Sequence, residues 1–263
     1  MQRWQMGNKQ MAYNEFAYFY DSFNEDADYD ALYRHIKAEL ENHGIHSGIL
    51  ADLGCGTGEL TLMLAQAGYD MIAIDQSEEM LCVVRDKADQ LELTGRLLLL
   101  EQDLCSLDLY GTIRGAVSTF DTFNHLPQLD AAIANASFFM EKGGVLLFDM
   151  NTPYKHREVL GNNTFTFEGE DAGCVWTNRL EDGGRRVRIA LDIDDRASGE
   201  RFHEEFCEYT YELAEIRAAL ERHGFTLESV CDGETFGPLT DTSERYFFCA
   251  VKNYTQLEGE HHG

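Results

Sequence analysis

The chain of 263 residues carries 47 acidic and 21 basic side chains, a formal net charge of -26, and 44% of its residues are hydrophobic. This is the composition of a globular protein, with room for one large domain with an insertion or for two small domains. Nucleic acids and anionic membranes are bound through Lys and Arg, so the acidic excess argues against both as partners.

The cysteines and the apolar runs indicate the compartment. No run of about 18 apolar residues occurs, and residues 1–10 lack the apolar centre of a signal peptide. The seven cysteines are scattered and never spaced as C-x-x-C, which is typical of reduced thiols. We therefore expect a cytoplasmic protein.

Helical periodicity dominates the first 46 residues. Aromatic residues recur at helical spacing from Phe16 to Phe23, and a second apolar stripe runs from Tyr29 to Leu40. The pattern predicts two helices before the first strand.

From Gly48 onward, apolar runs alternate with helical segments, which predicts a parallel sheet with helices on both faces. The expected strands are 49–53, 71–74, 97–100, 116–120 and 145–148, and the expected helices are 60–67, 78–91 and 129–141.

The sequence pattern changes after Pro153, where short strand patterns are separated by turn signals at 181–184 and 197–199. These patterns predict an antiparallel insert. A helix that ends at Gly224 and two further strands then return to the main sheet. The insert strands are expected at 165–168, 174–180, 186–193 and 203–211, the helix at 213–223, and the returning strands at 225–231 and 246–252.

The most informative segment is Asp52-Leu-Gly-Cys-Gly-Thr-Gly58, where a strand runs into glycines and then into a helix. Glycine lets the backbone turn tightly and lets a ligand lie against the main chain. The segment follows the carboxyl end of the first strand, where open α/β sheets bind ligands. We therefore expect a ligand site here.

Glu59 narrows the class of ligand. A dinucleotide fingerprint needs Gly or Ala at this position, and a carboxylate at the helix N-terminus opposes a pyrophosphate. The loop suits a nucleoside without phosphates, which argues against a nicotinamide- or flavin-dependent oxidoreductase.

Polar residues also follow the next two strands. Asp75 ends the strand 71–74, near the offset of about 20 residues at which an acidic residue reaches ribose hydroxyls. Gln102 and Asp103 follow the strand 97–100 and could accept a hydrogen bond from an adenine amino group.

Together these segments resemble the class I S-adenosylmethionine-dependent methyltransferases, over roughly residues 12–150. The resemblance rests on 52–58, 73–75, 102–103 and 120–121, in the family's order. It implies an α/β fold with a Rossmann-like, doubly wound, seven-stranded and mostly parallel sheet, and S-adenosylmethionine as cofactor. It further implies that Asp52 and the glycines hold the methionine part, Asp75 the ribose, and Asp103 with Leu104 the adenine. The predicted cofactor-binding residues are Tyr20, Tyr29, Asp52, Gly54, Cys55, Gly56, Gly58, Asp75, Gln76, Met80, Gln102, Asp103, Leu104 and Phe120.

A small-molecule subgroup, similar to the methyltransferase-25 and sugar N-methyltransferase families, matches further segments. These are 17–21 with Tyr29, which resemble its cofactor lid, and 120–126 and 148–153, which resemble its strand-end motifs. In such relatives the lid tyrosines approach the methionine carboxylate, a role carried over to Tyr20 and Tyr29; simple packing of an aromatic helix stripe is the alternative. The implied division is a helical lid at 1–46, a cofactor-binding domain at 47–153 and 212–254, and an insert at 154–211 that forms an acceptor lid or a homodimer contact.

Methyl transfer from a sulfonium is an in-line displacement, so the protein must align the reactants, exclude water and remove a proton from an alcohol or ammonium acceptor. His125, just past the fourth strand, is the candidate base, with a purely structural histidine as the alternative. On the strand 203–211, one face carries His203, Glu205, Cys207, Tyr209 and Tyr211 and either lines an acceptor pocket or serves ordinary sheet packing. Position 207 is Cys where the zinc motif H-E-x-x-H needs His, so no metal is expected.

The sequence thus predicts a methyltransferase that acts on a small molecule, without nucleic-acid or membrane partners. Two alternatives stay open: an RNA- or ribosome-associated methyltransferase, against which the acidic charge argues, and a non-catalytic protein that binds S-adenosylmethionine.

Overall fold

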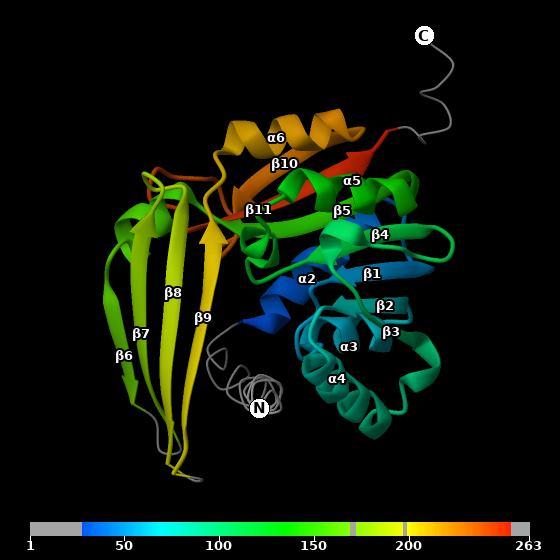
Figure 1. Cartoon of the computed structure of the whole chain (residues 1–263). Coiled ribbons are helices and arrows are strands. Elements are labelled where there is room, and N and C mark those ends of the chain that lie inside the picture. The colour runs from blue at the N-terminus through cyan, green and yellow to red at the C-terminus, as the bar shows by residue number, and fades with distance from the viewer. Residues whose placement is uncertain (1–27, 169–171, 197–198, 254–263) are drawn as a thin grey trace, which may run out of the picture.

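The computed structural model describes residues 28–168, 172–196 and 199–253. These residues form a seven-stranded sheet and a separate four-stranded sheet (Figure 1). The strands of the larger sheet are β1 (Ile49–Leu53), β2 (Asp70–Asp75), β3 (Leu97–Glu101), β4 (Ile113–Ser118), β5 (Met140–Asn151), β10 (Phe225–Asp232) and β11 (Arg245–Lys252).

The larger sheet has the order β10-β11-β5-β4-β1-β2-β3. Its neighbouring strands pair in parallel except where β11 lies antiparallel to β5 and to β10. The order reverses direction at β1, because the chain first builds outward through β2 and β3 and then returns to the other side with β4. This confirms the doubly wound, mostly parallel fold predicted from the alternating pattern.

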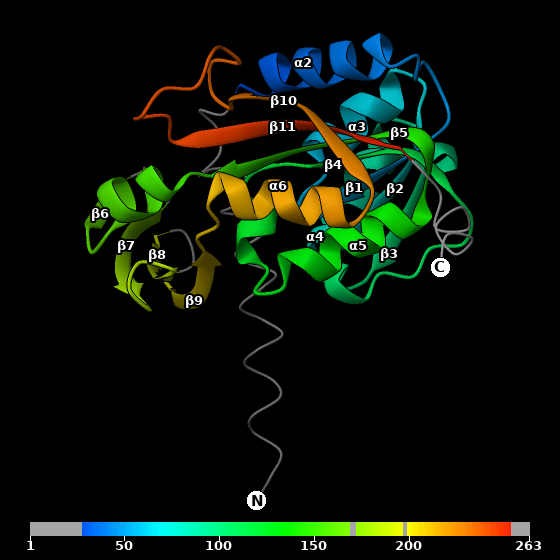
Figure 2. The same ribbon diagram turned by 90° about the horizontal axis from the view of Figure 1, so that it is seen from above.

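Helices cover both faces of the sheet, as Figure 2 shows. On one face, α2 (Tyr29–Asn42) and α3 (Glu59–Gln66) share a core in which Ile36 and Leu64 are fully buried. On the other face, α5 (Leu129–Phe139) and α6 (Leu213–Arg222) pack through Ile133 and Leu220. A further helix, α4 (Glu78–Gln90), follows β2. No helix in the described part of the chain combines the length and the apolar character that a membrane span requires.

The parallel register brings two sequence motifs to one edge of the sheet. Leu53 of β1 lies opposite Ile74 of β2. Gly54 and Asp75 therefore leave neighbouring strands at the same level, so the glycine segment and the acidic strand end meet by topology alone.

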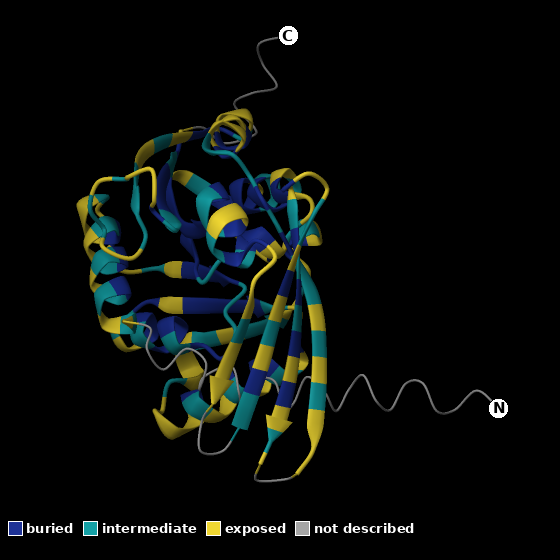
Figure 3. Ribbon diagram, turned by 90° about the vertical axis from the view of Figure 1, so that its left-hand side faces the viewer, coloured by how far each residue is buried: buried dark blue, intermediate teal, exposed yellow. Residues whose placement is uncertain are grey.

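The second sheet comprises β6 (Thr164–Glu168), β7 (Ala172–Glu181), β8 (Arg186–Asp195) and β9 (Arg201–Tyr209), all antiparallel. Buried and exposed positions alternate along its strands, as Figure 3 shows. Val187, Ile189, Leu191 and Ile193 of β8 form its buried face with Leu160 and Cys174. The sheet occupies the chain between β5 and α6.

A buried hydrogen-bond network joins the two sheets. It centres on Glu208 of β9, whose Oε2 lies 2.8 Å from His156 Nε2 and 2.8 Å from Asn151 Nδ2. His156 belongs to the short helix η4 (Lys155–Leu160), which the sequence did not predict, and its Nδ1 lies 2.8 Å from Thr210 Oγ1. Because buried polar groups are costly to leave unpaired, this network holds the second sheet in a defined position against β5.

Candidate active site

The segment after β1 needs glycine at two positions. Gly54 and Gly58 have φ angles of 77° and 83°, in the left-handed region. A Cβ at Gly54 would lie 2.3 Å from Cγ2 of Thr122, and one at Gly58 would lie 2.8 Å from Cγ2 of Val84. Any side chain here would therefore both strain the backbone and displace its neighbours.

Asp75 at the end of β2 ties this segment to α4. Its Oδ2 accepts a hydrogen bond of 2.9 Å from the Gly56 amide, and its Oδ1 accepts one of 3.0 Å from the Ser77 amide. Burial raises the pKa of Asp75. Each oxygen keeps a second lone pair, so the carboxylate can still accept hydrogen bonds from hydroxyl groups.

Asp52 in β1 is a buried carboxylate with only part of its hydrogen-bonding capacity used. Its side chain is 2% exposed, and Oδ2 accepts a bond of 2.5 Å from the Thr61 hydroxyl. Among the described residues, Oδ1 has no hydrogen-bond partner. Burial raises the pKa of Asp52 to about 7. An unpaired buried carboxylate oxygen is suited to a cationic donor from a ligand.

A cavity of about 200 Å³ lies over these strand ends. Of the predicted residues, Gly54, Gly56 and His125 line it. From the ends of β2 and β3 it is lined by Asp75, Gln76, Met80, Gln102, Asp103 and Leu104.

A smaller adjoining cavity receives Tyr29, Asp52 and Cys55, and Gly54 and Phe120 line both cavities. Gly58, the residue before α3, lines neither cavity, because it packs against Val84 of α4. Tyr20 lies outside the described residues. Three residues that were not predicted from the sequence also line the larger cavity, namely Ser77, Thr122 and Leu126, although each is close in sequence to a predicted residue.

Gln102 and Asp103 differ in their availability to a ligand. The Gln102 side chain donates to the Asp108 carbonyl at 3.0 Å and accepts from the Asp108 amide at 2.9 Å, which closes the loop after β3. Asp103 uses Oδ1 to accept from the Cys105 amide at 2.8 Å. Since both ends of the Gln102 amide are engaged, Asp103 is the better candidate for a direct ligand contact.

A strained turn follows β4. Phe120 and Asp121 have φ angles of 56° and 54°, which are unfavourable for residues with a side chain. Asp149 of β5 accepts from both their amides, at 2.9 Å and 2.6 Å. Arg245 of β11 donates to Asp149 at 2.9 Å and to Asp121 at 3.1 Å. Asp149 and Arg245 thus form a clamp that stabilises the turn. Backbone strain of this kind is typical of functional sites.

The clamp positions two groups at the cavities. The Phe120 ring lies 4.9 Å from the Tyr29 ring, centroid to centroid. His125 ends the short helix η3 (Thr122–His125), which starts directly after the strained turn. Arg245 was not found from the sequence, because it lies 124 residues from Asp121 and no local pattern announces it.

His125 is surrounded by carboxylates. Its Nε2 lies 3.7 Å from Asp121 Oδ2, and its side chain is 39% exposed. Burial acts to lower the pKa of His125, but the bond to Asp121 and the charge of Glu208 outweigh it and raise the pKa. Burial acts to raise the pKa of Asp121, but Arg245 and His125 act to lower it more strongly. The pKa of Asp121 is therefore well below its usual range. The surrounding carboxylates therefore favour the protonated form of His125 at the cavity.

Asp121, His125 and Glu208 each place one potential ligand atom within 4.8 Å of the others. The Arg245 guanidinium, 3.1 Å from Asp121, already supplies a positive charge to this group. A divalent cation would be repelled by it, so the arrangement favours proton handling over metal binding.

The face of β9 that approaches His125 carries Phe206. It is the opposite face from the one with His203, Glu205 and Cys207 that the sequence suggested as a pocket lining. The Phe206 ring lies 5.2 Å from the His125 ring, centroid to centroid, and is tilted to it, whereas His203 is exposed and lies 2.8 Å from Asp192 of β8. The register with β8 decides this, because Phe206 lies opposite the buried Ile189.

Comparison with known proteins identifies the family. A family model described as a methyltransferase domain matches residues 50–144. The chain is 30% identical over 253 residues to YqeM of Bacillus subtilis (strain 168), a protein named as a methyltransferase, and the match covers 93% of this chain and 99% of that protein. An S-adenosylmethionine-dependent methyltransferase from Clostridium acetobutylicum ATCC 824 has a solved structure with a TM-score of 0.83 and 27% identity, covering 92% of this chain and 99% of that one.

The chain belongs to the class I S-adenosylmethionine-dependent methyltransferases. S-adenosylmethionine is its cofactor. The methyltransferase also shares its fold with CalS10, an amino pentose methyltransferase from Micromonospora echinaspora, at a TM-score of 0.69 and 19% identity over 89% of this chain and 96% of that one. The unpaired Oδ1 of Asp52, and Gly54, which lines both cavities, fit such a cofactor, which carries an ammonium group and a sulfonium.

Proposed function

We propose that this methyltransferase acts on a small-molecule acceptor and that His125 removes the proton from the acceptor nucleophile. The observation that carries the proposal is that His125 and Asp75 line the same cavity. The candidate base and the proposed cofactor-binding residues would thereby face one cavity. When bound, S-adenosylmethionine supplies a methyl group that its sulfonium activates toward displacement.

The cofactor roles follow from the hydrogen-bonding capacity of the strand ends. Asp52 would receive the ammonium of the methionine part on Oδ1, and Asp75 would accept from the ribose hydroxyls. Asp103 and Leu104 would border the adenine at the end of β3. Tyr29, packed on Phe120, would border the methionine part, with Tyr20 as the predicted second lid residue.

The second sheet and the net charge support a small acceptor. The Phe206 ring of the second sheet lies 5.2 Å from the His125 ring, so β9 would border an acceptor bound beside His125. The net charge of -26 opposes nucleic acid. The seven cysteines are all unpaired, which supports the predicted cytoplasmic location.

In the catalytic step, the protein's contribution is alignment and proton removal. Deprotonated His125 would accept the proton as the nucleophile attacks the methyl carbon. The resulting imidazolium would be stabilised by Asp121 and Glu208, whose charges already raise the pKa of His125 after the opposing effect of burial. Arg245 keeps Asp121 ionised for this purpose.

The test is a screen of small amines and alcohols, scored by the release of S-adenosylhomocysteine from wild type, His125→Ala and His203→Ala. His203 is an exposed histidine paired with Asp192 and serves as the control. We expect His125→Ala to keep cofactor binding and to lose about 10²- to 10⁴-fold in turnover, the usual contribution of a general base. Full turnover in His125→Ala would refute the base assignment. Absence of any turnover with saturating cofactor would favour the binding-protein alternative, and retention on a polyanion column at physiological salt would favour an RNA substrate.

A further inference from the structure

The residue before the candidate base is a fully buried asparagine. Asn124 and His125 are adjacent in η3, yet Asn124 is 0% exposed, while the His125 side chain is 39% exposed and lines the larger cavity. Asn124 lines neither cavity. Its side chain is therefore directed into the protein, where a buried amide needs hydrogen-bond partners.

Asn124 joins the base-bearing helix to both sheets. Its Oδ1 accepts a bond of 2.8 Å from the main-chain amide of Asn151, the last residue of β5. Its Nδ2 donates a bond of 3.0 Å to the main-chain carbonyl of Tyr209, the last residue of β9. A carboxamide offers both an acceptor and a donor, whereas a carboxylate only accepts and an alkyl side chain does neither. One side chain thus fastens η3 to two strand ends that belong to different sheets.

A second bond holds the chain on the other side of His125. The Tyr211 hydroxyl donates to the Leu126 carbonyl at 2.6 Å. Leu126 lines the larger cavity, and Tyr211 follows the end of β9. The residues immediately before and after His125 are therefore both fastened to the segment in which β9 ends.

The same end of β9 supplies one of the charges around His125. One carboxylate oxygen of Glu208 lies within 4.8 Å of ligand atoms of both His125 and Asp121, and Arg245 is the cation bound to Asp121. Burial acts to lower the pKa of His125, but the bond to Asp121 and the charges of Glu208 and Asp75 outweigh it. Because Coulomb energies fall with distance, these effects last only while the imidazole keeps its place among the carboxylates.

We infer that Asn124 is a positioning residue that keeps the His125 imidazole between Asp121 and Glu208 at the cavity. It acts through the short helix that it fastens to β5 and β9. The effect on methyl transfer rests on the proposed function of His125 as the base, whereas the effect on the placement of the ring does not.

Asn178 of the second sheet is a matched control. It is 3% exposed, accepts a bond of 2.6 Å from Trp176 Nε1 and donates one of 3.1 Å to the Asn163 carbonyl. Its amide thus makes the same two kinds of bond in a buried position that lines neither cavity. Replacing either asparagine by alanine should lower the stability of the fold, but only the loss of Asn124 should disturb His125.

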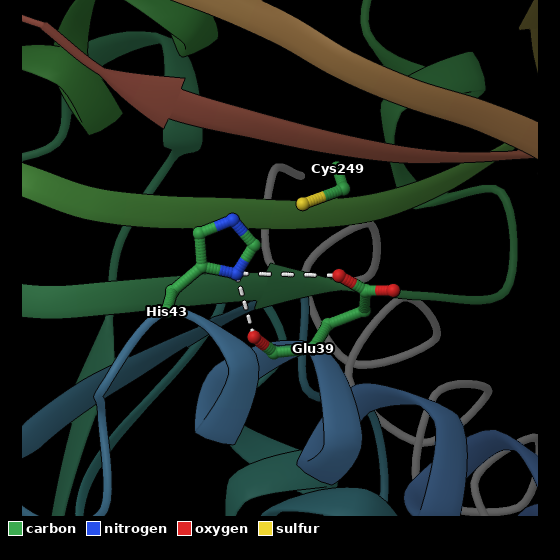
Figure 4. A group of neighbouring side chains, drawn as sticks. All are labelled: Glu39, His43 and Cys249. Carbon is green, nitrogen blue, oxygen red and sulfur yellow. Dashed lines mark hydrogen bonds and ion pairs between the residues drawn. The ribbon is translucent and has the colours of Figure 1, made fainter.

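His43 provides an internal reference for the titration of His125. Figure 4 shows it beside Glu39 and Cys249, between α2 and β11. Its Nδ1 lies 2.7 Å from the Glu39 carbonyl oxygen and its Nε2 lies 2.9 Å from Oε2 of Glu228. Both ring nitrogens face oxygen acceptors, so His43 offers no lone pair to a metal ion and fastens the end of α2 to β10. Since none of these residues lines either cavity, His43 should titrate independently of Asn124.

The test is a proton NMR titration of the histidine ring signals in wild type, Asn124→Ala and Asn178→Ala, with the His125 signal assigned by its absence from His125→Ala. We expect the pKa of His125 in Asn124→Ala to fall toward the value of free histidine, about 6.5, while His43 titrates as in wild type. The kcat should fall by up to about 100-fold, the loss that a misplacement of about 1 Å can cause. The affinity for S-adenosylmethionine in calorimetry should not change. Tyr211→Phe should move the pKa and kcat in the same direction and by less, and Asn178→Ala should change neither.

The outcomes separate this inference from the proposed function. A folded Asn124→Ala in which His125 keeps its wild-type pKa overturns the inference, and so does an equal fall of that pKa in Asn178→Ala. If Asn124→Ala does not fold, Asn124→Ser is judged by the same criterion, because its hydroxyl keeps one donor and an acceptor in a smaller side chain. Full turnover in His125→Ala would remove the base assignment, but the titration would still decide whether Asn124 holds the ring in place.

Discussion

Asp52→Asn should strengthen the unliganded fold and weaken cofactor binding at the same time. The carboxylate is 2% exposed, and among the described residues Oδ1 has no partner. Burial raises the pKa of Asp52 from 3.8 to about 7. The folded state thus holds this proton more tightly than the unfolded state does. The contribution of this protonation to the free energy of unfolding is present in full below pH 3.8 and is lost as the pH rises through 7.

The size of the effect follows from the shift. The difference between 7 and 3.8 is about 3 pKa units, which corresponds to roughly 4 kcal/mol at pH 8 as an upper value. Asn carries no charge but still has polar atoms to satisfy, so we expect a net gain of about 2 kcal/mol at pH 8. For a chain of this size this raises Tm by roughly 4 to 8 °C. The gain should disappear at pH 4.

Cofactor affinity should move in the opposite direction. Asn cannot pair with an ammonium group as a carboxylate does, and hydrogen bonds to charged groups contribute about 1.5 to 3 kcal/mol. Calorimetric titration with S-adenosylmethionine should therefore show a loss of roughly 10- to 100-fold. Asp70→Asn, an exposed residue of β2 paired with Arg96, is the control and should change neither quantity. Equal stability of Asp52→Asn and wild type at pH 8, together with unchanged affinity, would refute the reasoning.

Three further changes probe the strand ends. Asp75→Ala should cost roughly 1 to 3 kcal/mol of cofactor affinity, because ribose hydrogen bonds are lost; calorimetric titration checks this, and unchanged affinity removes Asp75 from the site. The wild-type rate should rise with pH through a His125 pKa above that of free histidine. Glu208→Gln should move this rise to lower pH, because it removes a negative charge that raises the pKa of His125. An unmoved pH profile of kcat contradicts the assignment. Arg245→Met should destabilise the fold by about 3 to 5 kcal/mol in urea unfolding, because it leaves buried carboxylates without their cation, and a loss below about 1 kcal/mol would show that the clamp is dispensable.

Local features of the sequence determined the main sheet and its glycine turn. The apolar run of β1, the glycines after it and the acidic residue ending β2 each depend on neighbours within a few residues. Gly54 and Gly58 adopt a left-handed backbone that glycine takes without strain. Parallel pairing then brings consecutive strand ends together, so the position of Asp75 beside Gly56 could be predicted. The roles of the individual cofactor residues, including Tyr20, stay predictions.

Only the tertiary structure decided which distant groups complete the site. Arg245 reaches Asp121 from the last strand, and Glu208 approaches His125 from the second sheet. The exposed face of β9 was set by its pairing with β8, since period two defines two faces without saying which one is buried. The side-chain amide of Gln102, a predicted ligand contact, instead bonds the main chain of Asp108, six residues further along the chain. Such contacts depend on how finished elements pack, and no local pattern of residues records that arrangement.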